Sequence, residues 1–377
     1  MKKQLELYLH IPFCVRKCAY CDFLSSPADE LTKDQYVKAL IREIKSHNQQ
    51  YTDYTVTTIF IGGGTPSILK SEQIISIFKA IRESFEIRHD AEITIEVNPG
   101  TVTEEKLYAW KEAGINRLSI GLQTVNDDEL KMLGRIHSYE QFLDTFAMAR
   151  KADFTNINVD LISAIPGQTF ESWCETLRTV AELSPEHISA YSLIIEEGTP
   201  FFDKYAEHEE LLPDEDTERK IYEETERILD EYGYKRYEIS NYAKEGYKCW
   251  HNCGYWERKE YLGLGIGSAS LIGDRRFNNV SDLEKYLTTN NIEYENVEIL
   301  TEKEQMEEFM FLGLRMMDGV QKSKFKQVFS RDMEDIYGDI LSDLYNKKLL
   351  EISGDTIRLT RHGIDVSNYV FEKFLLD

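Results

Sequence analysis

Three cysteines lie close together near the start of the chain, at Cys14, Cys18 and Cys21. Their spacing puts three thiols on one short loop, where they can converge on a single soft metal centre. A structural zinc site usually takes its ligands in pairs, and the later pair here, Cys249 and Cys253, lies far along the chain. An iron–sulfur cube held by three cysteines would leave one iron open to a small molecule. The pattern favours an iron–sulfur cluster, with a zinc loop or three unrelated thiols as alternatives.

The composition predicts a folded, acidic protein of more than one domain. The chain has 377 residues, of which 42% are hydrophobic and 12% aromatic, and this is enough for a packed core. At roughly 100–200 residues per domain, the length predicts two or three domains. The formal net charge is −23, from 44 basic and 67 acidic residues. Because this field repels phosphate backbones, we expect no nucleic acid among the partners.

The start of the chain predicts a cytoplasmic location. No run approaches the roughly 18 apolar residues that a membrane span needs, so no transmembrane segment is expected. Two lysines open the sequence, but Gln4 and Glu6 interrupt any apolar core of a signal peptide. In a reducing compartment, cysteines are expected to be free thiols, metal ligands or catalysts rather than disulfides.

From residue 4 to about residue 243, short runs of β-branched and aromatic residues alternate with amphipathic stretches of helical period. Strands that alternate with helices indicate a parallel sheet. About six such units predict an α/β fold, an incomplete TIM-like (β/α)6 barrel rather than a flat doubly wound sheet. The expected strands are Leu5–Ile11, Thr55–Ile61, Ala91–Val97, Arg117–Leu122, Asn156–Ile165, His187–Ile195 and Lys235–Ser240.

Beyond residue 243 this alternation stops. Residues 244–300 are rich in Gly, Asn and aromatic residues, which predicts ordered loops with a short hairpin. Residues 301–377 predict helices, a hairpin within 349–360 that turns at SGD, and a last helix over HGIDVSNYVFEKFLL. We therefore expect a barrel domain over 1–243, a linker and hairpin region over 244–300, and a small α+β winged-helix-like domain over 301–377. Acidic residues outnumber basic ones in this last domain, which favours protein packing over DNA binding.

Glycine-rich and polar motifs follow several of the expected strands: GGGTPS, EVNPG, GLQT and AIPGQ, besides the cysteine loop. Any one of them could be an ordinary loop, since loops are rich in Gly and Pro. In parallel α/β folds, however, the loops after the strands meet at one edge and build the active site. We therefore expect the functional site at this edge.

The residues around the cysteines, LYLHIPFCVRKCAYCDF, resemble the signature of radical S-adenosylmethionine proteins. The resemblance implies that Cys14, Cys18 and Cys21 hold a [4Fe-4S] cluster, with S-adenosylmethionine on the open iron. It also implies one-electron chemistry, which needs a reductant. The YxHIPFC lead and the YCDF tail are similar to the branch that contains oxygen-independent coproporphyrinogen III dehydrogenase and its relatives.

Further positions match those with which this superfamily binds S-adenosylmethionine. The resemblance implies that Gly63, Gly64 and Thr65 contact the methionine amino end, where glycine lets the backbone come close. It implies Glu96 for the ammonium and Arg135 for the methionine carboxylate. The other matches are Gln123 and Asp160 for the ribose hydroxyls, Tyr8 and Tyr20 beside the cluster, and Ile194 as an apolar wall for adenine. Two alternatives stay open: a tight turn for the glycines and a plain ion pair between Glu96 and Arg135. Ordinary packing stays open for Tyr20 and Ile194.

Two relatives within the branch compete. The dehydrogenase pattern has a fourth cysteine where this chain has Phe23, and a segment ahead of its tyrosine for which the residues before Tyr8 leave no room. Both departures favour the HemW-type heme chaperones, whose HNxxYW motif reads here HNCGYW. The resemblance implies His251 as an axial nitrogen for heme, with Tyr255 and Trp256 as flat apolar walls. A packed, hydrogen-bonded histidine is the alternative.

Some features near this motif depart from the chaperone pattern. Ile266 and Ala269 stand where relatives often have Pro and His. Cys249 and Cys253 bracket His251, and we interpret them as ordinary semi-buried thiols, with a thiolate ligand or a second metal site as the alternatives.

We therefore expect a heme chaperone that carries the cluster and S-adenosylmethionine, binds heme and transfers it to an unidentified acceptor protein. The alternative is a radical enzyme acting on a tetrapyrrole, by coproporphyrinogen oxidation or by heme breakdown. The departures at the cluster loop argue against coproporphyrinogen oxidation, and any other catalysis is left open. Self-association into a homodimer is also left open.

Overall fold

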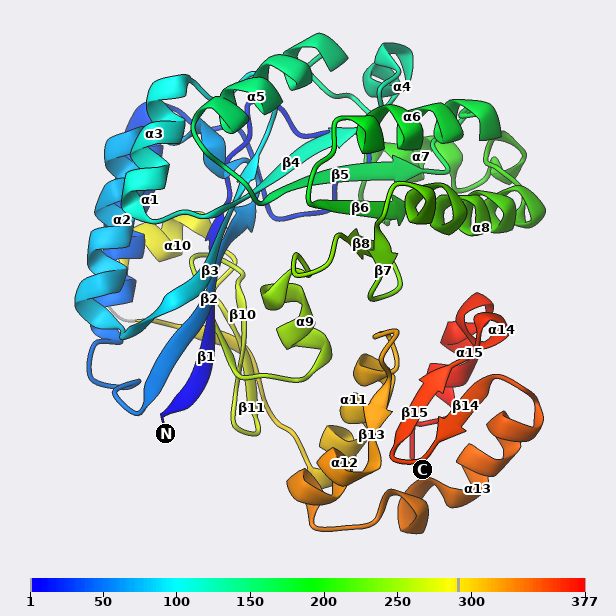
Figure 1. Cartoon of the computed structure of the whole chain (residues 1–377). Helices are drawn as coiled ribbons and strands as arrows, with labels where there is room; N and C mark the ends of the chain where they lie inside the picture. The colour runs from blue at the N-terminus through cyan, green and yellow to red at the C-terminus, as the bar shows by residue number, and fades with distance from the viewer. Residues whose placement is uncertain (1, 290–291, 377) are drawn as a thin grey trace.

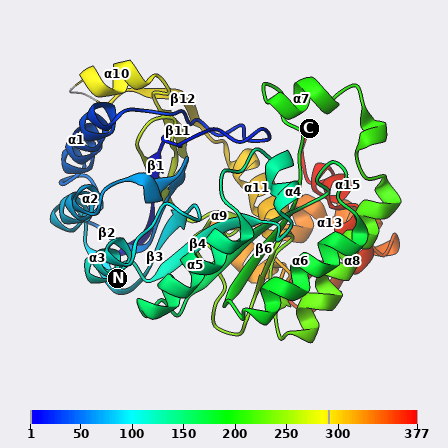
Figure 2. The same ribbon diagram turned by 90° about the horizontal axis from the view of Figure 1, so that it is seen from above.

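The computed structural model describes residues 2–289 and 292–376; Met1, Asn290, Asn291 and Asp377, at the edges of two expected domains and within the third, lie outside the described residues. Six parallel strands form the centre of the main sheet and stand side by side in chain order. The sheet curves into an open partial barrel, which confirms the predicted fold (Figures 1 and 2). These strands are β1 (Lys3–Ile11), β2 (Tyr54–Gly63), β3 (Ile87–Val97), β4 (Arg117–Gln123), β5 (Ile157–Ser163) and β6 (His187–Ser192).

Helices connect the parallel strands and cover the outer side of the sheet (Figure 2). Thr169 begins one of them by accepting a hydrogen bond from the Ser172 amide, and Trp173 and Leu177 are then buried one turn apart. The Trp173 indole donates to Thr225 on a neighbouring helix at 2.8 Å. The helices are α1 (Glu30–Ser46), α2 (Ser71–Ser84), α3 (Glu104–Ala113), α4 (Asp127–Met132), α5 (Tyr139–Lys151), α6 (Phe170–Glu182), α7 (Pro200–Tyr205) and α8 (Glu215–Glu231), with short 3-10 turns η1 (Pro66–Ile68) and η2 (Glu209–Leu211).

Strand β1 shows how alternation positions the site. Leu5, Leu7 and Leu9 are fully buried in the apolar core that the outer helices share. Glu6 and Tyr8 alternate with them and therefore project to the opposite, inner side of the barrel. The polar residues of the parallel strands thus gather inside the barrel.

The expected strand over Lys235–Ser240 is wrong in part. The chain forms β7 (Lys235–Arg236), turns, and returns as β8 (Asn241–Ala243), which pairs antiparallel with β6 at the sheet edge. The reason is local: the Glu238 carboxylate accepts from the Ser240 amide at 2.8 Å and stabilises the turn.

The region after β8 extends the other edge of the sheet. The expected hairpin is present as β10 (Ala269–Ile272) and β11 (Arg275–Asn279). The prediction of loops for the rest was wrong, because β9 (Tyr261–Leu264) pairs in parallel with β1. A helix inside the barrel was also missed (Figure 1). The added elements are α9 (Trp250–Trp256), α10 (Leu283–Thr288) and β12 (Tyr294–Ile299).

The C-terminal part has a separate hydrophobic core and a three-stranded sheet in the order β13-β15-β14. Its elements follow the winged-helix order, as predicted. The expected last helix is broken at Val366 into two short ones. The elements are α11 (Glu302–Gly313), β13 (Val320–Gln321), α12 (Lys322–Phe329), α13 (Met333–Asn346), β14 (Leu350–Ser353), β15 (Thr356–Leu359), α14 (Arg361–Asp365) and α15 (Ser367–Glu372). The three domain boundaries stay a prediction. In the described ranges, no helix combines the length and the apolar character that crossing a bilayer requires.

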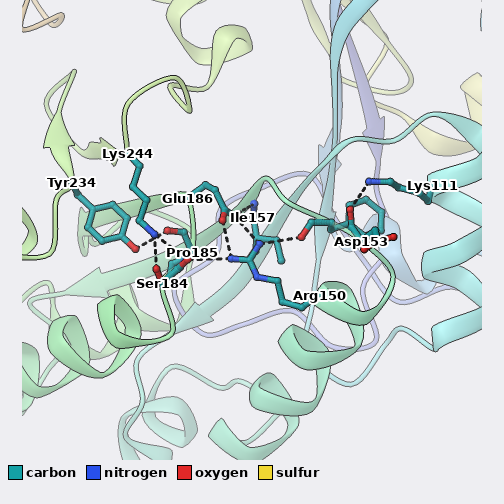
Figure 3. A network of polar contacts seen from close by, with 10 residues as sticks. Lys111, Arg150, Asp153, Ile157, Ser184, Pro185, Glu186, Tyr234 and Lys244 are labelled. Atoms are coloured by element: carbon teal, nitrogen blue, oxygen red, sulfur yellow. Dashed lines mark hydrogen bonds and ion pairs between the residues drawn. The ribbon is translucent and has the colours of Figure 1, made fainter.

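A polar network lies at the edge of the sheet where β5 and β6 begin (Figure 3). The Arg150 guanidinium makes two hydrogen bonds to the Glu186 carboxylate, at 2.9 and 3.0 Å, and donates to the Phe154 and Ser184 carbonyls. Glu186 also accepts from the Ile157 amide at the start of β5, at 3.0 Å. One carboxylate therefore ties a helix, a loop and a strand together.

Replacing this carboxylate, as Glu186→Ala, is expected to lower the free energy of unfolding by about 2 kcal/mol, because charge-assisted hydrogen bonds to Arg150 and to a backbone amide are lost. Urea unfolding measures the effect. Glu83→Ala is the matched control, since Glu83 pairs with Lys45 across two half-exposed side chains and should cost less than about 1 kcal/mol. Equal losses in the two variants would contradict the prediction.

Candidate functional site

The motifs singled out in the sequence meet at one edge of the barrel. Cys14 to Cys21 follow β1. The GGGTP motif, residues 62–66 and called the glycine loop below, begins at the end of β2. The register then places Glu96 of β3 opposite Ser119 of β4, and Gly121 of β4 opposite Asp160 of β5. Because these strands are parallel, their carboxyl ends share this edge.

The cysteine loop is anchored to the neighbouring loops. The Cys14 sulfur accepts a hydrogen bond from the Thr65 hydroxyl at 3.4 Å, and the Cys18 sulfur accepts one from Arg135 at 3.6 Å. Burial raises the pKa of Cys21, and the neighbouring thiols raise it further. Such donors and apolar surroundings tune iron–sulfur clusters, so the residues fit one.

Cys14, Cys18 and Cys21 are all free thiols and only partly buried. Within residues 2–289 and 292–376, no three His, Cys, Asp or Glu side chains are placed to hold a single metal ion.

His10 supports the cysteine loop, although it is not among the predicted site residues. One ring nitrogen lies 2.8 Å from the Leu24 carbonyl at the end of the loop, and the other lies 3.0 Å from the Tyr8 hydroxyl. Burial lowers the pKa of His10, so the imidazole is neutral at pH 7. The available signal was its position, a polar residue on the inner side of β1 just before the cysteines.

The glycine loop needs glycine for two reasons. Gly63 has a φ of +109°, and a Cβ there would lie 2.6 Å from the His10 ring. A Cβ on Gly64 would lie 2.7 Å from the Phe13 carbonyl. Thr65 continues the loop with its amide bonded to the same Phe13 carbonyl at 2.7 Å. The loop therefore presents bare backbone beside the cysteines, which is what close approach of a ligand requires.

Glu96 is a buried carboxyl next to this backbone. It accepts a hydrogen bond from the Gly63 amide at 3.0 Å. Burial, together with the nearby Asp160, raises the pKa of Glu96 to about 8. A cationic group bound against it would lower that pKa again, because an opposite charge favours the ionised form. The residue therefore fits a ligand ammonium.

Arg135 and Glu96 make no ion pair with each other in the described structure, where each has other partners, so the plain ion-pair alternative is wrong. Its guanidinium donates instead to Asn98 and, at 2.7 Å, to the Gly121 carbonyl. Its Nε is buried and has no hydrogen-bond partner among the described residues. A buried cation with a free donor fits a ligand carboxylate.

The remaining predicted positions differ in how well they are placed. Asp160 is held in the barrel by Ser119 at 2.9 Å and Asn158 at 2.8 Å. Gln123 ends β4 with a φ of +77°, which turns the chain at the same edge. Tyr20 is partly buried and packs near Phe201. Ile194 follows β6 and is 67% exposed, so its apolar side chain is accessible to a ligand.

The HNCGYW motif forms α9, which lies inside the barrel. His251 is 1% exposed, and both ring nitrogens are hydrogen-bonded, to the Thr58 and Tyr255 hydroxyls. Trp256 packs under the Arg315 guanidinium. This arrangement does not fit His251 as the predicted axial ligand of heme, because neither ring nitrogen is free.

The two cysteines on this helix are buried thiols. Burial raises the pKa of Cys253 to about 12 and that of Cys249 well above its ordinary value. The Cys249 thiol donates to Glu92 at 3.5 Å. Neither is therefore poised as a thiolate.

Known proteins resemble this chain in sequence over its whole length. Residues 8–180 match the radical SAM superfamily, and residues 300–366 match the HemN C-terminal domain. The heme chaperone HemW of Lactococcus lactis is 38% identical over 100% of this chain and 99% of its own length. That of Bacillus subtilis is 37% identical over 98% of each chain. That of Escherichia coli is 33% identical, over 99% of this chain and 98% of its own.

The chain belongs to the HemW family. The solved structure titled "Coproporphyrinogen III oxidase (HemN) from Escherichia coli is a Radical SAM enzyme" has the same fold, with a TM-score of 0.86 over 99% of this chain and 90% of its own, at 26% identity. The HemW-family fold is thus shared with an enzyme. The backbone alone does not distinguish a chaperone from an oxidase, and the distinction rests on individual residues.

Proposed function

We propose that this protein is a heme chaperone, which binds heme and transfers it to an acceptor protein. The observation that carries the proposal is the identity with proteins named heme chaperone HemW, which extends over the full length of both chains. We propose that it acts in the cytoplasm, with a reductant for its cluster as a second partner. A homodimer stays open.

We further propose a [4Fe-4S] cluster with S-adenosylmethionine as its resident cofactors. Cys14, Cys18 and Cys21 would hold the cluster. Glu96 would bind the ammonium, and Arg135 would orient the carboxylate through its unpartnered Nε. Thr65 and Arg135 already donate to the sulfurs of Cys14 and Cys18, and so hold the cysteine loop against the neighbouring loops. Bound together, these cofactors supply one-electron chemistry, and the protein positions them and limits access.

The second candidate is a radical enzyme acting on a tetrapyrrole, favoured by the fold shared with the coproporphyrinogen oxidase. Phe23 argues against it. This residue stands where the dehydrogenase pattern has its fourth cysteine, and its side chain is exposed at the end of the cysteine loop. It can offer an apolar surface but no metal ligand.

The deciding experiment starts from anaerobic reconstitution of the cluster in the full chain, followed by titration with hemin. We expect a broad iron–sulfur absorbance and a saturable Soret band at one heme per chain. Added apomyoglobin, as a model acceptor, should then gain the Soret band that this protein loses. Incubation with coproporphyrinogen, S-adenosylmethionine and reductant should yield no decarboxylated product. Product at enzymatic rates, or a cluster without heme binding, would replace the chaperone with the radical enzyme.

A further inference from the structure

Helix α9, which carries the HNCGYW motif, lies on the inner side of the curved sheet against β2 (Figure 1). There the His251 ring stacks on Phe60 of β2, with centroids 5.2 Å apart and planes 23° from parallel. One nitrogen, Nδ1, lies 2.7 Å from the Thr58 hydroxyl, and the other, Nε2, lies 2.9 Å from the Tyr255 hydroxyl. The imidazole is therefore in contact on one face and at both nitrogens.

The surroundings keep this imidazole neutral. Burial, together with the nearby Arg117 guanidinium, lowers the pKa of His251 to about 3. The only facing carboxyl within ion-pair distance in the described structure is Glu6, at 3.8 Å. Burial raises the pKa of Glu6 to about 9, so this carboxyl is also neutral at pH 7. A neutral imidazole has one N–H and one lone pair, and here both are used.

The rest of the helix is fixed by equally specific contacts. The Glu92 carboxylate accepts from the backbone amides of Trp250 and His251, both at 3.1 Å, and so holds the start of the helix. Gly254 faces β1, where any Cβ would collide with the Glu6 carboxyl. Only glycine at this position lets the helix lie so close to the strand.

The far end of α9 contacts the C-terminal part of the chain. The Arg315 guanidinium lies 4.4 Å from the Trp256 ring. Arg258, just beyond the helix, and Arg276 of β11 both pair with Glu308 of α11, at 2.8 and 2.7 Å. The motif residues His251, Tyr255 and Trp256 therefore join the barrel interior to the C-terminal domain.

We infer that His251 is a positioning residue that holds α9 in the barrel, and that heme takes its protein ligand from another residue. The inference rests on the proposed heme binding. To bind iron, His251 would need a free lone pair on a ring nitrogen and space for the iron beside it. Here the lone pair is engaged in a hydrogen bond, and Phe60, Thr58 and Tyr255 occupy the space around the ring.

The test is hemin titration of the full, cluster-reconstituted chain, comparing wild type with His251→Ala and His251→Gln. We expect one heme per chain and an unchanged Soret maximum and EPR spectrum in all three. We also expect a lower unfolding midpoint for His251→Ala, partly restored in His251→Gln, because the amide can again bond Tyr255. Loss of the heme band, or a shifted Soret maximum that added imidazole restores, would overturn the inference.

A second variant covers failure of His251→Ala to fold. Tyr255→Phe keeps the histidine and frees its Nε2, so a ligand role predicts tighter heme binding, whereas a positioning role predicts unchanged affinity and a small loss of stability. His89→Ala, on a side chain that is 94% exposed, is the matched control for removal of an imidazole. If wild type itself shows no Soret band, heme binding fails, and this is distinct from any difference among the variants.

Discussion

Replacing Cys18 with serine is expected to abolish assembly of the iron–sulfur cluster while the fold is retained. Cys18 lies on a partly buried loop outside the hydrophobic cores, and its sulfur makes one hydrogen bond, from Arg135. Serine preserves the size and the polar contact but not the soft ligand that iron requires. Iron should fall from about four atoms per chain to near background. The affinity for S-adenosylmethionine should fall at least tenfold, because the cluster iron to which it would bind is lost.

Iron and sulfide analysis after anaerobic reconstitution measures this effect, with visible absorbance as a second readout. Cys174→Ala is the control for loss of a thiol outside the loop and should leave the iron content unchanged. The paired variant Cys249→Ala with Cys253→Ala tests the other buried thiols. Full iron in Cys18→Ser, together with loss of iron in the paired variant, would place the cluster elsewhere.

Replacing Gly63 with alanine is expected to weaken S-adenosylmethionine binding more than tenfold and to lower the free energy of unfolding by about 3 kcal/mol. Two costs combine at this position. The φ of +109° is strained for any residue with a Cβ, and the new methyl group would lie 2.6 Å from His10. Relief of the clash would displace His10, which contacts the cysteine loop, or the Gly63 amide, which donates to Glu96.

Gly233→Ala separates these two costs. Gly233 has a similar φ of +84°, but no atom lies within 4 Å of the place of its Cβ. Only backbone strain of about 1 kcal/mol is therefore expected there, with unchanged ligand affinity. Calorimetric titration of the cluster-loaded protein and urea unfolding measure both quantities. If the two variants behaved alike, close packing of the glycine loop against His10 would not matter.

Much of the barrel could be predicted because its signals are local. In β1, leucines alternate with more polar residues. This period of two predicts a strand with one apolar side, and it can be recognised without knowing the neighbours of the strand. The cysteine loop and glycine loop could likewise be assigned, since each carries its pattern within a few residues. Their meeting at one edge then followed from the parallel order of the strands.

Apart from the locally formed turn between β7 and β8, the errors occurred where partners are distant in sequence. Tyr261–Leu264 is a strand because β1 offers it a parallel edge, and nothing in its neighbours along the chain indicates that pairing. The HNCGYW motif shows the same limit. Its sequence is compatible with a heme ligand or with a packed histidine, because both need an imidazole beside aromatic residues.

The amino-acid sequence by itself determined the six parallel strands with the helices between them, the cysteine loop and the family, because these depend on residue types and short spacings. The tertiary structure decided what His251 does. Its partners Thr58 and Phe60 come from β2, far away along the chain, and only folding shows that they occupy one nitrogen and one face of the ring. Whether a polar group is free to bind a ligand depends on which distant groups have already satisfied it.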